Sequence, residues 1–462
     1  MRAARLSLLA ATVATLATVA ACGGGGGSAG AAPGPAPAPA PGPAPTPPAP
    51  ADNAALPGEI VVRLLRGSDF AAVTADFGLT AIDRFGQRPI WQLRVPAGRD
   101  TQAVIDALRA DPRVLNAEPN YENETPEGRR RTPWATGGDA GTYATQWAPE
   151  ALRLPAAHAL SRGNGIRVAV LDTGIDLAHP ALAPRLARTA GGALLGRDFV
   201  DDDADPAEGG GIGDTGYGHG THVAGLVALA APGSTLMPAR VLDAQGRGNV
   251  WVLAEALLWA VDPDANPATD DGAHVVNLSL GTTRATDLLR TAVALADCDF
   301  DDDDDAFNDP GYDDDKERCS RKHGAVVLAA AGNAGDDQEL QFPAAEQAPG
   351  ALAVAASTAQ RTLAGFSNRG SWVQIAAPGE AIISTFPGGG YATWSGTSMA
   401  TPLAAGTAAL VLGRFADPRS VLPLDVAKRL VDRSSALCGT PLRQVDAAAA
   451  VEDTQAPDPA CP

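Results

Sequence analysis

The sequence predicts an α/β protein with a doubly wound, mostly parallel sheet in its main domain, preceded by a small α+β domain. From residue 166 onward, short apolar runs rich in β-branched residues alternate with longer apolar helical stretches, as expected for strands covered by helices on both faces. The runs 166–171 and 325–331 are each followed by a polar side chain, and open α/β sheets place their sites at such strand ends. The 462 residues, 45% of them hydrophobic, suffice for a sizeable core and more than one unit.

The N-terminal residues 1–22 have the pattern of a signal peptide. Arginines precede the apolar stretch Leu6–Ala21, which is too short and too soon interrupted to be a stable membrane span. Val19-Ala20-Ala21-Cys22 resembles a bacterial lipobox, which implies a lipidated Cys22 and a membrane anchor. An ordinary secretory signal is the alternative. We expect an exported protein that is lipid-anchored in the bacterial cell envelope or at its surface, or released from it.

A linker and a small domain follow the signal. Residues 23–57 contain a glycine run and alternating Ala and Pro, a composition that favours extended polyproline conformations and predicts a tether. Residues 58–124 instead have the periodicities of a β-α-β-β-α-β unit. Its expected elements are the strand Gly58–Leu64, the helix Ser68–Phe77, the strand Ile90–Val95, the helix Asp100–Ala110 and the closing segment Val114–Asn120.

One serine occupies a position suited to catalysis. In Gly396–Pro402, Ser398 lies in the first turn of the apolar helix that continues through Leu403–Leu412. Unpaired backbone N–H groups and the positive end of the helix dipole can stabilise an oxyanion there. The same residues would also form an ordinary N-cap. A serine nucleophile needs a histidine base and a carboxylate that orients the base, so the presence of these two groups distinguishes a nucleophile from an N-cap.

Other segments supply these groups. His219 lies in the glycine-rich run Gly218–Gly225 ahead of an apolar helical stretch, and Asp172 follows a buried strand. An aspartate that only starts a turn is the alternative for Asp172. His222 lacks the His-Glu-x-x-His spacing of a zinc site, and His274 is interpreted as structural.

In the order Asp, His, Ser, three blocks resemble the signature blocks of subtilisin-like serine peptidases. They are Val170–Asp176, Gly218–Gly225 and Gly396–Pro402. The resemblance extends over residues 143–450 and implies a serine endopeptidase that hydrolyses peptide bonds through an acyl-enzyme. In that mechanism Ser398 attacks the carbonyl, His219 transfers the proton and Asp172 orients His219.

The same resemblance implies further parts of the site. Ala330-Ala331-Gly332-Asn333 resembles the family block whose asparagine donates to the oxyanion, which gives that role to Asn333. A left-handed turn residue is the alternative for Asn333 alone. Ser279, Leu280 and Gly281 match the backbone that lines the family's cleft, where a protein or peptide substrate binds as an extended strand.

The small domain also resembles a part of this family. Its element order and its Ala117-Glu118-Pro119-Asn120 ending resemble the inhibitor-like, ferredoxin-like propeptide domain of subtilisin-family zymogens. The resemblance implies a propeptide that assists folding and blocks the cleft until it is cut off, so the chain's own propeptide is an expected partner. A small independent binding domain is the alternative. We expect the cut between Tyr121 and Tyr143, in or near the linker 125–142.

The charge of the chain limits its partners. A net charge of −19 argues against nucleic acid as a partner. Acidic residues gather in Asp198–Asp205 and in Asp297–Asp315, which is interpreted as an insertion in the peptidase domain. Either loop offers oxygen ligands for a structural calcium ion, but Asp297–Asp315 lacks EF-hand spacing, and solvated acidic loops are the alternative. The triad chemistry itself requires no cofactor.

The cysteine content agrees with an oxidising compartment. Of five cysteines, Cys22 is assigned to lipid, which leaves an even number for disulfides. Three pairings are open, and a free thiol is the alternative for each cysteine. We favour Cys298 with Cys319, which closes the acidic segment, and Cys438 with Cys461, which pins the tail.

We therefore expect the self-processing zymogen of a serine endopeptidase, with the peptidase domain at 143–450 and a tail at 451–462. A self-cleaving surface protein whose main role is binding or adhesion is the alternative, because it would keep the same triad. A catalytically inactive scaffold is disfavoured, since all the expected positions are filled.

Overall fold

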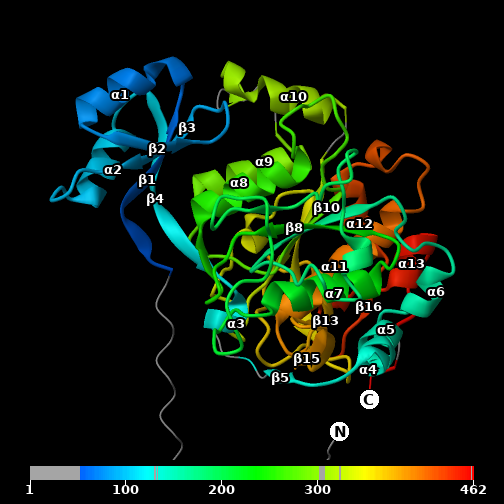
Figure 1. The fold of residues 1–462 in the computed structure, drawn as a ribbon. Coiled ribbons are helices and arrows are strands. Elements are labelled where there is room, and N and C mark those ends of the chain that lie inside the picture. The colour runs from blue at the N-terminus through cyan, green and yellow to red at the C-terminus, as the bar shows by residue number, and fades with distance from the viewer. Residues whose placement is uncertain are drawn as a thin grey trace, which may run out of the picture. The chain divides into compact units, whose positions relative to one another are not determined.

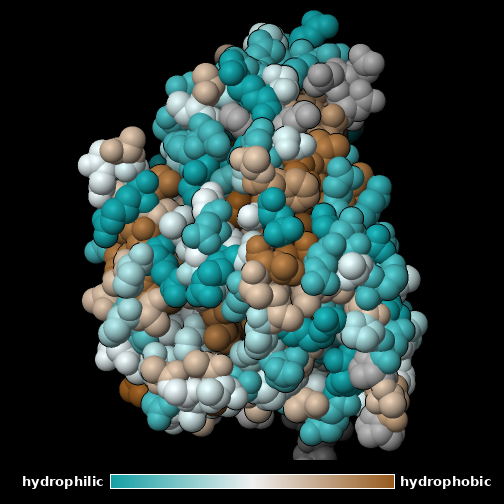
Figure 2. Space-filling model, turned by 90° about the vertical axis from the view of Figure 1, so that its right-hand side faces the viewer, coloured by the Kyte–Doolittle hydropathy of each residue, from teal (hydrophilic) through white to brown (hydrophobic). Residues whose placement is uncertain are grey.

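The computed structural model describes residues 53–129, 132, 134–300, 307–321, 324–458 and 460–461 (Figure 1). The expected signal peptide, the lipobox residue Cys22 and most of the linker 23–57 lie outside these residues. No helix in the described ranges combines the length and the apolar character that crossing a bilayer requires. The face drawn in Figure 2 mixes hydrophilic and hydrophobic side chains, with the hydrophobic ones in separate groups.

The first described part of the chain folds as a β-α-β-β-α-β unit, the expected order, and its second strand is one that the sequence analysis did not locate. Its elements are β1 (Ala55–Leu64), α1 (Phe70–Phe77), β2 (Thr80–Arg84), β3 (Ile90–Arg94), α2 (Thr101–Arg109) and β4 (Val114–Glu124). The strands pair antiparallel in the order β2-β3-β1-β4, and the helices pack against them around Ile60, Leu93 and Leu108. The Asp100 carboxylate caps α2 by accepting from backbone N–H groups of its first turn.

β4 is longer than the expected segment Val114–Asn120, because its last residues pair with a strand of the main domain. Glu122–Glu124 runs antiparallel to β9 (Arg247–Asn249), which becomes the edge strand of the small sheet. β1 likewise begins at Ala55, before the expected Gly58. The small unit and the main domain therefore share one sheet.

A large, mostly parallel sheet forms the centre of the main domain and confirms the predicted doubly wound fold. Its strands are β6 (Arg167–Asp172), β7 (Arg197–Asp198), β8 (Thr235–Arg240), β10 (Val275–Leu278), β11 (Val326–Ala330), β12 (Ala351–Ser357), β13 (Ile375–Pro378), β16 (Ser435–Ala436) and β17 (Arg443–Gln444). Their order is β16-β17-β13-β12-β11-β10-β6-β8-β7. The pairs from β17 to β7 are parallel, whereas β16 and β17 are antiparallel.

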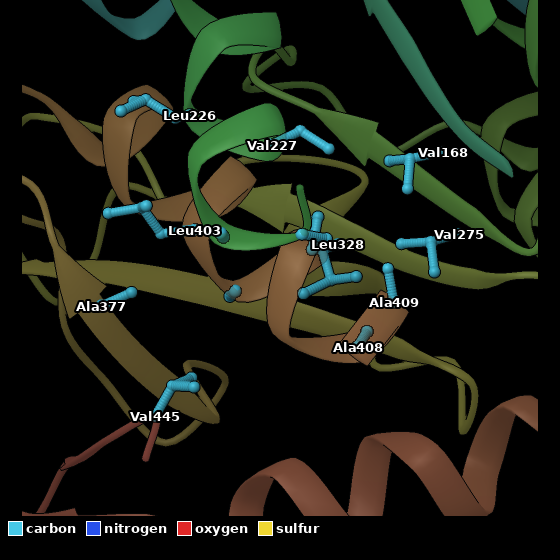
Figure 3. Close-up of a cluster of buried hydrophobic side chains, with 14 of the residues drawn as sticks. Val168, Leu226, Val227, Val275, Leu328, Ala377, Leu403, Ala408, Ala409 and Val445 are labelled. Atoms are coloured by element: carbon cyan, nitrogen blue, oxygen red, sulfur yellow. The ribbon is translucent and has the colours of Figure 1, made fainter. Parts of the chain in front are cut away.

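Helices cover both faces of this sheet. They are α7 (His219–Ala230), α8 (Val250–Val261), α9 (Asp287–Asp297) and α11 (Thr397–Leu412). Along β6, Val168 and Val170 join the apolar cluster of α7 and α11, whereas Ala169 and Leu171 join that of α8 and α9. Burial on both sides explains why the strand sequence is apolar without interruption. Figure 3 shows side chains of the first cluster, from α7, α11 and the sheet.

Smaller elements complete the main domain. The hairpin of β14 (Ile382–Phe386) and β15 (Gly390–Trp394) is extended by β5 (Trp134–Thr136), which comes from the segment after the small unit. The remaining α-helices of the described chain are α3 (Pro126–Arg129), α4 (Ala140–Thr145), α5 (Trp147–Ala151), α6 (Leu154–His158), α10 (Asp313–Ser320), α12 (Pro423–Asp432) and α13 (Ala447–Glu452).

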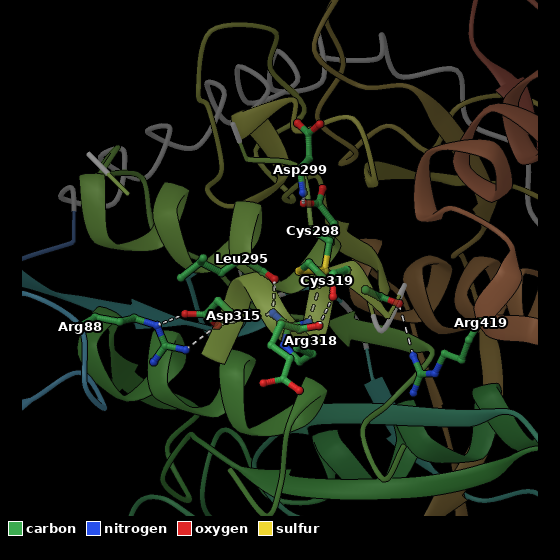
Figure 4. The surroundings of a disulfide bond; sticks show 12 residues. Arg88, Leu295, Cys298, Asp299, Asp315, Arg318, Cys319 and Arg419 are labelled. Atoms are coloured by element: carbon green, nitrogen blue, oxygen red, sulfur yellow. Dashed lines mark hydrogen bonds and ion pairs between the residues drawn. A yellow bond between two sulfur atoms is a disulfide. The ribbon is translucent and has the colours of Figure 1, made fainter. Parts of the chain in front are cut away.

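Disulfides fix the acidic segment and the tail. They join Cys298 to Cys319 and Cys438 to Cys461, which are the pairs favoured from the sequence. The first closes the acidic segment that follows α9, and Figure 4 shows it beside side chains of α10.

A glycine lets α7 and α11 pack closely. A Cβ on Gly406 would lie 2.4 Å from the Cβ of Ala230, closer than real Cβ atoms come. We expect Gly406→Ala to lower the free energy of unfolding by about 1–3 kcal/mol, because the two helices must move apart. Gly365→Ala is the matched control, since a Cβ there meets nothing within 4 Å. Thermal unfolding of both variants measures the effect, and an unchanged melting temperature in Gly406→Ala would contradict the close packing.

Candidate active site

Asp172 and His219 are in direct contact where β6 ends and α7 begins. His219 Nδ1 donates to Asp172 Oδ1 at 2.7 Å, and both side chains are buried. The backbone N–H of Thr173 donates to the same carboxylate oxygen. Gly220 makes this approach possible, because a Cβ there would clash with the carbonyl oxygen of Gly174.

Ser398 lies in the first turn of α11, as the sequence predicts. Its Oγ is 3.2 Å from the carbonyl oxygen of Ser279, which follows β10. Ser279 Oγ in turn donates to the carbonyl oxygen of Ser398 at 2.9 Å. These hydrogen bonds fix the start of α11 against the end of β10, and the first turn of the helix has N–H groups without partners inside the helix.

Asn333 follows β11, and Thr397 fixes the orientation of its side-chain amide. Asn333 Oδ1 accepts from the backbone N–H of Thr397 at 2.9 Å and from its hydroxyl at 3.0 Å. The Nδ2 group is therefore left to donate elsewhere. The ends of β6, β10 and β11 thus bring Asp172, Ser279 and Asn333 to one edge of the sheet.

A carboxylate that the sequence analysis missed, Glu127 of α3, lies between these groups. Its Oε2 accepts from Ser398 Oγ at 2.6 Å and from His219 Nε2 at 3.1 Å, and its Oε1 accepts from Asn333 Nδ2 at 2.8 Å. The carboxylate lies against Gly396, where any side chain would take its place. No local sequence pattern separates Glu127 from a surface glutamate, so only the tertiary structure identifies it.

His219 has a carboxylate on each ring nitrogen. Burial lowers the pKa of His219, but Asp172 and Glu127 outweigh this effect and raise the pKa to about 10. Burial acts to raise the pKa of Glu127, but hydrogen bonds from His219, Ser398 and Asn333 hold it below its usual range. His219 is therefore an imidazolium that donates from both nitrogens, with no lone pair free to accept a proton.

The tail of the small unit runs through a groove beside these groups. Glu124 pairs antiparallel with Gly281 through N–H···O bonds of 2.9 and 3.0 Å, and the N–H of Thr125 donates to the carbonyl of Gly246 at 3.1 Å. The same tail pairs with β9 on its other side. An extended chain thus lies between β9 and the segment Ser279–Gly281, in which Leu280 is buried.

The other histidines singled out from the sequence do not join the site. His222 Nε2 lies 3.1 Å from the carbonyl oxygen of Ala392, and burial together with the charge of His219 lowers the pKa of His222 to about 3. His222 is therefore neutral. His274 Nδ1 accepts from the backbone N–H of Arg167 at 3.2 Å.

Arginine neutralises part of the negative charge in one of the two acidic loops. In the loop 198–205, Arg240 Nη1 pairs with Asp198 at 2.6 Å and Asp201 at 2.5 Å. Within the described ranges, one group of three or more possible metal ligands has its ligand atoms within 4.8 Å of one another, and it consists of Asp262, Asp264 and Asp271. This group lies in neither loop for which calcium was expected, so calcium in those loops stays a prediction.

Glu208, also missed from the sequence, ties the turn after β6 to the start of α7. Its carboxylate accepts from Thr173 Oγ1 at 2.7 Å, and from the N–H and the hydroxyl of Thr221 at 3.1 and 2.7 Å. Thr173 Oγ1 in turn accepts from the N–H of Gly220. Glu208 thereby supports the segments that carry Asp172 and His219.

Both the main domain and the small domain are similar to known proteins. The subtilase family profile matches residues 163–447, and the fervidolysin N-terminal prodomain profile matches residues 43–120. The chain is 33% identical over 372 residues to the thermophilic serine proteinase of Bacillus sp. (strain AK1), covering 78% of each chain. It is 35% identical over 286 residues to thermitase of Thermoactinomyces vulgaris, covering 60% of this chain and 85% of that one. It is 36% identical over 275 residues to subtilisin BL of Lederbergia lenta, covering 57% of this chain and 83% of that one.

Burial raises the pKa of Glu208 from its usual 4.5 to about 7. The folded chain therefore binds the proton of the Glu208 carboxyl more tightly than the unfolded chain does. The contribution of this proton to the free energy of unfolding is complete below pH 4.5 and is lost as the pH rises through 7. Glu208→Gln resembles the protonated acid, so we expect it to flatten the pH dependence of the unfolding free energy by at most about 3 kcal/mol. Urea unfolding across this pH window measures the effect, and parallel curves for the variant and the unaltered chain would contradict it.

Proposed function

The chain belongs to the subtilase family, and on this basis we propose that it cleaves peptide bonds with Ser398 as nucleophile, His219 as base and Asp172 as the group that orients the base. It is a serine endopeptidase with an N-terminal prodomain. The observation that carries the proposed roles is the convergence of Ser398 Oγ, His219 Nε2 and Asn333 Nδ2 on one carboxylate. Glu127 Oε2 lies between the proposed nucleophile and base, and Glu127 Oε1, which accepts from Asn333 Nδ2, corresponds to the oxygen of a substrate carbonyl on which charge develops.

In the proposed mechanism, Ser398 Oγ attacks the carbonyl carbon while His219 Nε2 takes the hydroxyl proton. Asp172 accepts a hydrogen bond from Nδ1–H of His219, which keeps the lone pair on Nε2 and stabilises the imidazolium that forms. The oxyanion accepts from Asn333 Nδ2 and from the backbone N–H of Ser398 at the start of α11. His219 then returns the proton to the leaving amine, and water hydrolyses the acyl-enzyme by the same steps.

Substrates enter as extended strands in the place now occupied by the prodomain tail. β9 and the segment Ser279–Gly281 bind the backbone of that tail on its two sides. Ladder hydrogen bonds of this kind recognise backbone and are independent of the side chains, which suits protein and peptide substrates. The net charge of −19 of the whole chain argues against nucleic acid as a partner.

The chain is made as a self-processing zymogen. While Glu127 is in place, the Ser398 hydroxyl donates a hydrogen bond to Glu127 and His219 has no free lone pair, so neither group can react. Cleavage between Tyr121 and Tyr143 therefore requires Glu127 to leave the site. The alternative of a protein devoted to adhesion is not favoured, because the relatives are named as proteinases.

Export and a lipid anchor at Cys22 belong to the same proposal, with residues 58–124 as the prodomain and 143–450 as the peptidase domain. The signal pattern of residues 1–22 supports export, and so do the disulfides, which persist in oxidising compartments. The chemistry needs no cofactor, and calcium in the loops 198–205 or 297–315 would be structural.

Self-cleavage is tested by the intact mass of the purified chain beside Ser398→Ala. We expect the unaltered chain to lose its N-terminal unit by a cut between Tyr121 and Tyr143, whereas Ser398→Ala keeps its full mass and is inactive on an unrelated protein substrate. Identical processing of both chains, or full activity of Ser398→Ala, would refute the assignment of the nucleophile.

The role of Glu127 predicts a faster cut when its charge is removed. We expect Glu127→Gln to speed self-processing by about tenfold or more, because each hydrogen bond to a charged group is worth about 1.5–3 kcal/mol and the amide no longer holds His219 as an imidazolium. The rate is followed by intact mass after dilution from denaturant. Glu122→Gln, earlier in the same tail, is the matched control, and equal rates for the two variants would contradict the role of Glu127.

A further inference from the structure

The prodomain also touches the main domain away from the cleft, at the segment Cys298–Cys319, which we call the acidic insertion. This segment leaves α9 at Cys298, returns through α10 and is closed by the disulfide (Figure 4). Its described residues are 298–300 and 307–319. None of the proposed catalytic groups belongs to it, so the cleft chemistry does not explain why these residues are present.

One of these contacts is a buried, bidentate ion pair. Arg88, in the loop between β2 and β3, donates from Nε and Nη2 to the carboxylate oxygens of Asp315 on α10, at 2.8 and 2.7 Å (Figure 4). The Arg88 and Asp315 side chains are only 15% and 4% exposed. A bidentate pair fixes orientation as well as distance, and loss of Asp315 leaves the mostly buried charge of Arg88 without this partner. Asp315 Oδ1 also lies 3.6 Å from Nη2 of Arg318 on its own helix.

Neighbouring contacts use the backbone and aromatic rings. The backbone N–H of Gly67 donates to Asp309 Oδ2 at 2.7 Å. The guanidinium of Arg63 lies 4.9 Å from the ring centroid of Phe307 and 5.8 Å from that of Tyr312, within the range of a cation–π interaction. The insertion thus presents carboxylates and buried rings to arginines of the prodomain.

We propose that the acidic insertion is a docking surface for the chain's own prodomain, which holds the prodomain on the peptidase after the connecting segment has been cut. This inference rests on the proposed zymogen, because only a cut chain needs separate affinity between the two parts. An intact connection keeps the prodomain at a high effective concentration. After the cut, the prodomain stays only as long as its surface contacts last.

The insertion adds a second anchoring point along α9. At the N-terminal end of this helix, the Glu118 carboxylate of β4 accepts from the backbone N–H groups of Asp287 and Leu288, at 2.8 and 2.9 Å. The insertion begins at the opposite end of α9, at Cys298. Arg63 of β1 connects the two places, because it donates to Thr291 of α9 at 3.1 Å and lies over Phe307 of the insertion. Contacts at separate places restrict the rotation of the prodomain on the peptidase.

The disulfide keeps the docking surface in place. It joins the residue that follows α9 to α10, with Cα atoms 5.5 Å apart. Arg318 of α10 also donates to the carbonyl oxygen of Leu295 in α9. Loss of the disulfide therefore loosens the hold on the prodomain and leaves the proposed catalytic groups unchanged.

The test uses the full chain carrying Ser398→Ala, so that no self-cleavage intervenes. The amides of Glu124 and Thr125 donate across the prodomain interface in the cleft, and their hydrogen exchange reports how often the prodomain leaves. We expect Asp315→Asn to speed this exchange about tenfold to a hundredfold, since one partner of a buried pair is lost. Asp313→Asn, an exposed carboxylate on the same helix, is the matched control and leaves the exchange unchanged.

The disulfide is tested in the same way. We expect Cys298→Ser with Cys319→Ser to speed the exchange, whereas Cys438→Ser with Cys461→Ser, at the tail, does not. If the first pair of substitutions prevents folding, the exchange rate in Asp315→Asn alone decides whether the insertion holds the prodomain. In the active, processed chain, dilution separates the prodomain from the peptidase and so releases peptidase activity. We expect Asp315→Asn to reach this release at a protein concentration about tenfold or more higher than the unaltered chain.

The outcomes separate this inference from the proposed function. Equal exchange in Asp315→Asn, Asp313→Asn and the unaltered Ser398→Ala chain would overturn the docking role. A chain that keeps Ser398 and still remains uncut would refute self-processing, while the exchange measurements would continue to decide whether the insertion holds the prodomain.

Discussion

One hydrogen bond, from His219 Nδ1 to Asp172 Oδ1, sets the position of the other groups in the site. It joins the end of β6 to the start of α7, so the helix must begin at the carboxyl edge of the sheet. The absence of a side chain at Gly220 allows this approach, and Glu208 holds the two segments together from the other side. α11 packs on α7 through Gly406 and thereby brings Ser398 to the same edge.

The sequence predicts those parts of the structure that neighbouring residues mark by a recognisable pattern. Each catalytic candidate stands where an apolar strand ends or an apolar helix begins, and the strands are unbroken apolar runs because both of their faces are buried. Glu127 has no such signal, since its partners Ser398 and Asn333 are 271 and 206 residues away in the sequence. The end of β4 was missed for the same reason: its polar residues become a strand only by pairing with β9.

Many of the contacts that the prodomain and the following linker make with the peptidase are polar or charged. Glu127 of the linker, Glu118 at the start of α9 and Arg88 at the acidic insertion each meet a complementary hydrogen-bonding partner. Such contacts fix orientation, because hydrogen-bond donors and acceptors must be aligned. They are also exchanged readily for contacts with water once the surfaces part, which suits a domain that has to leave.

The pairing of β4 with β9 has a consequence for the enzyme without its prodomain. Departure of the tail leaves backbone N–H and C=O groups of β9 and Gly281 without partners along an open strand edge. An open edge is the feature that lets substrates bind, and it is equally a template on which unrelated extended chains stack and aggregate. The prodomain strand therefore protects the newly folded protein from such pairing, in the same way that a covering loop or helix guards the edge of an ordinary sheet.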